Sequence, residues 1–149
     1  MQIRELLAAQ PRELPFLCPD STVAHAMDLM SDKGVTGVLI GSDARTLGIF
    51  TSRDLLRCRR NFPNRAMLEI RVDEVMTQKL VVAEPRETVE QAMAMMIRAG
   101  IRHLPVVEDR RITSLLGLED LVRNHVTALT QEMHYLKDYI SDLQDAAHD

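Results

Sequence analysis

Three side chains able to do chemistry follow a short apolar run in the segment GIFTSRDLL, namely Thr51, Arg53 and Asp54. A carboxylate accepts two hydrogen bonds from a vicinal diol at once. A hydroxyl and backbone N–H groups at the start of a helix suit an anion. Thr and Asp are also favoured as helix caps, so a structural role for Thr51 and Asp54 stays open beside a binding role.

The segment SLLGLEDLV repeats this pattern at an offset of 66 residues, but most of its polar residues differ. Asp120 matches Asp54, whereas Gly117 replaces the hydroxyl, Glu119 the arginine and Ser114 the first glycine. A carboxylate beside an anion is repulsive by an amount comparable to one good hydrogen bond, and a serine would crowd a close approach. We therefore expect the first copy to form the competent site. The second would bind a polyphosphate poorly, and either stay empty or hold an uncharged group through Asp120.

The elements that position these segments belong to an internal repeat. PDSTVAHAMDLMSDKGV matches PRETVEQAMAMMIRAGI at the same offset of 66 residues. Each stretch has an apolar pattern of helical period between a threonine suited to an N-cap and a glycine suited to a left-handed C-cap. These caps are Thr22 and Gly34 in the first copy, and Thr88 and Gly100 in the second.

Each helix is followed by two short apolar runs separated by a polar turn, which predict strands. The runs are GVLI (37–40) and LGIF in the first copy, and LPVV (104–107) and ITSLL in the second, with helices opening near Ser52 and Leu118. A unit of roughly 60 residues has too small a core to be stable alone, so the two should pack together. The predicted fold class is α/β (α+β), with two pseudo-symmetric β-α-β-β-α units packed sheet to sheet. The expected divisions are 1–60 for the first unit, 61–71 for a linker, 72–128 for the second unit and 129–149 for a C-terminal helix.

Composition excludes several function classes. Hydrophobic residues make up 46% and charged residues 27% of the chain, a globular balance. No apolar run approaches the roughly 18 residues that span a bilayer, and the N-terminus lacks a signal-peptide core, so we expect a cytoplasmic protein. The net charge of −4 argues against a whole-surface nucleic-acid binder and leaves only local basic patches open. Neither metal-ligand spacing nor a nucleophile–base motif is present, which argues against an enzyme.

Several motifs in order resemble a known family. The duplicated unit, with GIFTSRDLL after its third strand, VDEVMT between copies and IRHLPVV in the second copy, is similar to a tandem cystathionine-β-synthase (CBS) domain pair, or Bateman module. The resemblance covers about residues 3–127. Within the family, the chain most resembles small bacterial stand-alone CBS-pair proteins. It implies non-catalytic, regulatory binding of AMP, ADP, ATP or S-adenosylmethionine in clefts between the units. Carried over, Asp54 would accept hydrogen bonds from ribose hydroxyls and Thr51 would donate to a phosphate.

The same resemblance places Arg102 and His103 on a strand facing the cleft between the units, where either could neutralise phosphate. The alternatives are a solvated arginine and a hydrogen-bonded structural histidine. The expected ligand-binding residues are Thr51, Arg53, Asp54, Arg102, His103 and Asp120, with no metal site.

Apolar residues continue beyond the repeat with alternating spacings of four and three. They are Val122, Val126, Leu129, Met133, Leu136, Ile140 and Leu143. With Val126 at a heptad a position, leucine occupies every d position, which favours a parallel two-stranded coiled coil. Glu132 at g and Lys137 at the following e would then pair between chains.

We therefore expect a homodimer, with the stripe folded onto the core up to about Ala128. Alternatively the helix docks another protein, and the chain is an interaction module whose pockets are vestigial.

Overall fold

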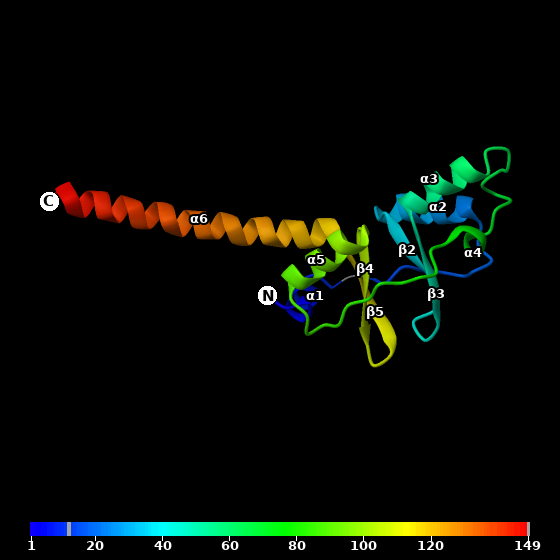
Figure 1. Ribbon diagram of the computed structural model, residues 1–149, viewed down its shortest axis with the longest axis horizontal. Coiled ribbons are helices and arrows are strands. Elements are labelled where there is room, and N and C mark those ends of the chain that lie inside the picture. Colours follow the sequence, from blue (N-terminus) through cyan, green and yellow to red (C-terminus); the bar gives the residue numbers. More distant parts are fainter. Residues whose placement is uncertain (12, 149) are drawn as a thin grey trace.

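The computed structural model describes residues 1–11 and 13–148, and Figure 1 shows the arrangement of their elements. The order along the chain is α1 (Ile3–Ala9), β1 (Phe16–Leu17), α2 (Val23–Lys33), β2 (Gly37–Gly41), β3 (Thr46–Thr51), α3 (Ser52–Asn61), α4 (Val72–Val75), α5 (Val89–Ala99), β4 (His103–Glu108), β5 (Arg111–Gly117) and α6 (Leu118–His148).

The first unit is a three-stranded sheet with its helices. β1 runs parallel to β2, and β2 pairs antiparallel with β3. The α2 helix begins where predicted, because the Thr22 hydroxyl accepts a hydrogen bond from the backbone N–H of His25 at 3.1 Å. It ends at Gly34, whose φ of 64° is the left-handed conformation that glycine adopts without strain. Both predicted caps are confirmed.

The second unit repeats this plan with a reduced sheet. β4 and β5 form an antiparallel pair joined by Asp109 and Arg110, both with positive φ. The counterpart of β1 is a single parallel bridge between Ala83 and Val106. Thr88 caps α5 and Gly100 closes it, again as predicted.

The two units exchange their leading helices. Ile3 and Leu6 of α1 are buried in the core of the second unit. Ile70, just before α4, and Val72, its first residue, are buried in the core of the first. A third cluster, centred on Leu39, Ile49 and Ile112, joins the two sheets. The predicted fold class, a mixed α/β structure with two small sheets and a long C-terminal helix, is confirmed.

The α6 helix projects far beyond the two units (Figure 1), and its 31 residues correspond to a length of ~46 Å. Leu121 is fully buried, but Val126 is already 53% exposed and every described side chain after His125 is exposed. The expectation that the core contact extends to about Ala128 was therefore wrong, because α6 is exposed from Val126 onward, where it extends beyond α5 (Figure 1). Within the described residues, none of the helices combines the length and the apolar character required to cross a membrane.

Candidate functional site: a cavity between the two units

A cavity of about 480 Å³ lies between the two units. Its described walls are α1, residues 10–11 and 13–15 after α1, the starts of β2 and β4, the end of β5 and the first turn of α6. The volume falls in the range of about 300–1,000 Å³ typical of small-molecule sites. The arrangement can therefore hold one small organic ligand in contact with both units.

Three of the residues predicted from the sequence, Arg102, His103 and Asp120, line this cavity. Asp120 lies in the first turn of α6 and accepts a hydrogen bond from the backbone N–H of Gly117 at 3.2 Å. The carbonyl of Arg102 accepts a hydrogen bond from the N–H of Leu118 at 2.8 Å, which ties the start of β4 to the start of α6. The second copy of the motif thus brings its carboxylate to the cavity wall.

His103 connects the two units at the cavity. Its Nε2 lies 2.8 Å from the Thr36 hydroxyl, and its ring packs on Gly37, where an added Cβ would be only 2.8 Å from the ring. Burial lowers the pKa of His103; Asp120 and Asp54 act in the opposite direction, and Arg102 adds to the lowering. The imidazole is therefore neutral at pH 7 and hydrogen-bonded.

Asp54 occupies a different environment. It is only 2% exposed, and its carboxylate accepts hydrogen bonds from the backbone N–H of Thr51 at 2.9 Å and from the hydroxyl of Thr77 at 2.8 Å. The guanidinium of Arg57 lies 3.8 Å away. Neither Thr51 nor Asp54 lines the cavity. The arrangement differs from the expected asymmetry: Asp120 lines the cavity, whereas the side chain of Asp54 is buried and hydrogen-bonded within its own chain. The ligand contacts expected of Thr51 and Asp54 stay predictions.

The first physical reason for this difference between the two copies is the segment Met76–Thr77, which lies against β3. We call this segment the strap. Thr77 exchanges two backbone hydrogen bonds with Ile49, donating at 2.8 Å and accepting at 2.9 Å. At the offset of 66 residues the equivalent positions are Pro11 and Leu115. Proline has no N–H to donate, so this pair of bonds cannot form in the second copy.

A glycine provides the second reason. A Cβ added at Gly48 would lie 2.7 Å from the carbonyl oxygen of Thr77 and 2.8 Å from the sulfur of Met76, so the strap depends on the missing side chain. Ser114 occupies the equivalent position in the second copy and carries that Cβ. The serine, expected to crowd the site, instead helps to keep it open.

The third difference concerns Arg53, which is not among the residues that line the cavity. Its Nη1 donates to the carbonyl of Gly100 at 2.6 Å and thereby joins the start of α3 to the end of α5. The equivalent residues are Glu119 and Gly34, which both line the cavity. A carboxylate cannot donate to a carbonyl, so Glu119 cannot form the corresponding hydrogen bond.

Sequence reasoning missed the contribution of the first unit to this cavity. Thr36, Gly37 and Ser52 line it, together with Leu6 and Leu7 of α1. The signal for Thr36 and Gly37 was available, since the repeat aligns them with Arg102 and His103. In the described part of the chain, no cluster of three or more His, Cys, Asp or Glu side chains could hold a metal ion.

Replacing Gly48 by serine tests the role of the strap. Because the new Cβ would lie 2.7 Å from the backbone carbonyl oxygen of Thr77, which is paired with Ile49, as well as close to the Met76 side chain, we expect the free energy of unfolding to fall by about 1–3 kcal/mol. The reciprocal change, Ser114→Gly, should cost no more than about 1 kcal/mol, the ordinary penalty for glycine in a strand. Urea denaturation of both variants measures the difference, and equal losses would contradict this explanation.

Comparison with known proteins agrees with the fold and the repeat. The family model for the CBS domain matches residues 5–61 and 72–126. A mitochondrial CBS domain-containing protein of Arabidopsis thaliana, CBSX3, is 31% identical over 81% of this chain, which spans 61% of that protein's length.

Solved structures of CBS-domain proteins superimpose closely. A putative signal-transduction protein with CBS domains from Burkholderia ambifaria has a TM-score of 0.79 and 29% identity, over 85% of this chain and 95% of that one. The CBS domain pair of a protein designated MJ0100, solved with 5′-methylthioadenosine and S-adenosyl-L-methionine, has a TM-score of 0.74. Its identity is 19%, over 86% of this chain and 98% of that one, so this likeness concerns the fold alone.

Proposed function

Because the chain belongs to the CBS-domain family and carries a tandem pair of its units, we propose that it is a non-catalytic regulatory module that binds an adenosine-containing ligand beside Asp120. The observation that carries the proposal is the cavity of about 480 Å³ that the motif carboxylate lines in the second copy. The adenosine-containing ligands of one structural neighbour support the ligand class.

We assign the roles from the chemistry of the lining residues. Asp120 accepts hydrogen bonds from the two hydroxyls of a ribose, as a carboxylate can accept both together. Apolar side chains such as Leu6 and Leu7 cover the faces of the adenine base. Arg102 and His103, at the start of β4, offer polar contacts. Thr51, Arg53 and Asp54 have a structural role in this proposal, because their polar atoms are engaged within the chain.

The position of the cavity also supports a route for the signal. Asp120 lies in the first turn of α6, so a ligand that draws the two units together acts directly on the base of that helix. The far part of α6 extends beyond both units (Figure 1) and would carry the change to a partner.

We propose that the occupant of the α6 stripe is a second copy of this chain. The apolar side chains from Val126 to Leu143 are all about half exposed, as expected for a coiled-coil seam seen without its partner. In a parallel pair, Glu132 at g and Lys137 at e of the other chain have opposite charges. This complementarity favours self-association over docking of an unrelated helix.

Asp120→Asn tests the ligand proposal. The amide keeps the shape but lacks the charge that strengthens both hydrogen bonds to a ribose, so we expect binding to weaken at least about tenfold. Thermal unfolding with AMP, ADP, ATP or S-adenosylmethionine reads this out, since a ligand at 100 times its Kd stabilises by about 2.7 kcal/mol. Asp109→Asn is the matched control, because Asp109 lies in the turn between β4 and β5, at the end of this hairpin that is away from Asp120.

The absence of any thermal shift at millimolar concentrations of all four ligands would contradict the proposal. The exposed stripe of α6 would then favour the alternative, an interaction module that acts through its helix alone.

A further inference from the structure

Three exposed arginines lie on one face of α3, and we call them the arginine row. Arg53, Arg57 and Arg60 are spaced four and three residues apart, which places them on the same side of the helix. Arg53 donates to the neutral carbonyl of Gly100, and Arg57 lies 3.8 Å from the carboxylate of Asp54, which is buried. Among the ion pairs of the described residues, none involves Arg60. The arginine row therefore presents positive charge to solvent.

Three exposed aspartates with the same spacing lie toward the far end of α6, and we call them the aspartate row. Asp138, Asp142 and Asp145 are likewise four and three residues apart. In the heptad of the α6 stripe they occupy f, c and f positions, opposite the seam of a and d positions. A second chain packed on the seam therefore leaves the aspartate row exposed.

The aspartate row does not stabilise its own helix. Like charges three and four residues apart on a helix repel each other. The helix macrodipole favours cations at a C-terminus, yet the C-terminal part of α6 carries these carboxylates. Within the described part of the chain, none of the ion pairs includes them. Their position is better explained by a contact outside the chain.

The two rows complement each other in charge and in spacing. Seven residues of α-helix span ~10.5 Å, so each arginine can meet an aspartate when α3 and α6 lie side by side in the same direction. The rows cannot meet within one chain, because α3 and the far end of α6 lie on opposite sides of the molecule (Figure 1). In a parallel pair of α6 helices, both aspartate rows likewise lie far from both α3 helices. The complementary surface therefore belongs to a copy outside that pair.

We propose that the arginine row of α3 binds the aspartate row of α6 in another copy of this chain. Because the two rows are different surfaces, the contact repeats from one copy to the next and produces open-ended assemblies. Leu56, which is 72% exposed and lies beside Arg53 and Arg60, adds apolar area to the contact. This inference does not depend on the ligand, so its failure leaves the proposed function of the cavity standing.

Sedimentation velocity at low and high salt tests this contact. The net charge of −4 makes copies of the chain repel one another, and salt weakens that general repulsion. Complementary rows have the opposite salt dependence, because screening weakens their attraction. We expect larger species at about 10 mM salt, where the Debye length is about 30 Å, than at about 1 M salt, where it is about 3 Å. Wild-type protein that sediments identically in both, or that associates further at high salt, would overturn the proposal.

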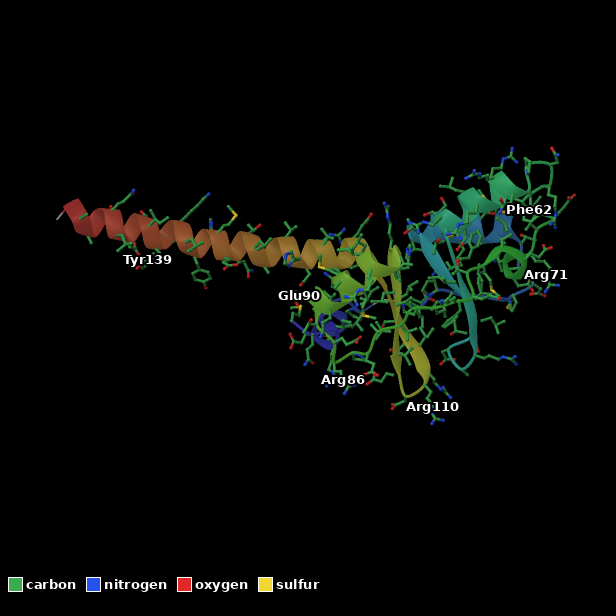
Figure 2. All side chains as sticks on the ribbon, in the orientation of Figure 1. Phe62, Arg71, Arg86, Glu90, Arg110 and Tyr139 are labelled. Atoms are coloured by element: carbon green, nitrogen blue, oxygen red, sulfur yellow. The ribbon has the colours of Figure 1, made fainter. Side chains whose placement is uncertain are left out.

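A charge exchange identifies the two rows. Arg60→Glu and Asp145→Arg should each weaken the low-salt association about tenfold, because each replaces an attraction by a repulsion. The double variant Arg60→Glu/Asp145→Arg again has opposite charges, so its association should return to within about twofold of wild type. The control is Arg110→Glu, which makes the same change in net charge in the turn between β4 and β5 (Figure 2).

Three outcomes of the charge exchange would overturn the proposal. The first is a double variant that does not recover its association. The second is a loss in only one of the two single variants, which would show that the two rows do not bind each other. The third is an equal loss for Arg110→Glu, which would make net charge rather than the arginine row the cause.

Discussion

Leu136→Glu in α6 is expected to convert a dimeric protein into monomers. Leu136 occupies a d position of the heptad stripe and is 57% exposed in the single chain. In a parallel coil it would face its counterpart, so the variant loses two buried leucines and places two carboxylates against each other. We expect a loss of about 4 kcal/mol in dimer stability, which is roughly a thousandfold in Kd.

Sedimentation equilibrium measures this change in mass. The matched control is Tyr135→Glu, since Tyr135 is 78% exposed and lies at a c position outside the seam. Figure 2 shows how freely side chains such as Tyr139 project from this part of α6. A wild-type protein that sediments as a monomer at all concentrations would contradict the proposed dimer, and so would a Leu136→Glu variant that remains dimeric.

Asp54→Ala is expected to cause a large loss of fold stability. In our proposal this substitution removes no direct contact to the ligand. The carboxylate accepts from the N–H of Thr51 and from the hydroxyl of Thr77, and it closes the capping box of α3. Hydrogen bonds to a buried charged group are worth about 1.5–3 kcal/mol each, and they are not additive. We expect the free energy of unfolding to fall by about 3 kcal/mol, with a decrease in Tm of about 6–12 °C.

Asp120→Ala provides the matched comparison at the equivalent position of the repeat. Asp120 is half-buried rather than buried and receives a longer hydrogen bond, at 3.2 Å, from Gly117. We therefore expect a stability loss of about 1 kcal/mol for Asp120→Ala, together with the loss of ligand binding. Calorimetric unfolding without ligand separates the two variants, and equal decreases in Tm would show that the two carboxylates are equivalent.

The predictions that succeeded rest on local interactions. Thr22 and Thr88 cap their helices through N–H groups only three residues away, and Gly34 and Gly100 end them in a conformation that neighbouring residues demand. The spacing of apolar residues in the two copies also predicted the helices and strands, because this spacing is a local property of each element. The repeat itself then required two similar units that share a core, which the structure confirms.

The environments of the predicted site residues depend on contacts between distant segments. Thr77 reaches Asp54 across 23 residues, and Arg53 reaches Gly100 across 47. From residue types alone, Arg53 was expected to bind a phosphate, and Glu119 was taken to indicate a second site that had lost this capacity. Only the tertiary structure shows that Arg53 bonds to the carbonyl of Gly100, whereas Glu119 lines the cavity.

The sequence by itself determined the duplication, the caps, the fold class and the heptad stripe of α6, because each is written in the spacing of residue types along a single element. The tertiary structure decided which of the two matching carboxylates faces open space. That choice depends on whether a preceding segment can approach the strand closely enough to form backbone hydrogen bonds with it. Thr77 does so against Gly48, whereas Pro11 has no N–H and Ser114 carries a side chain.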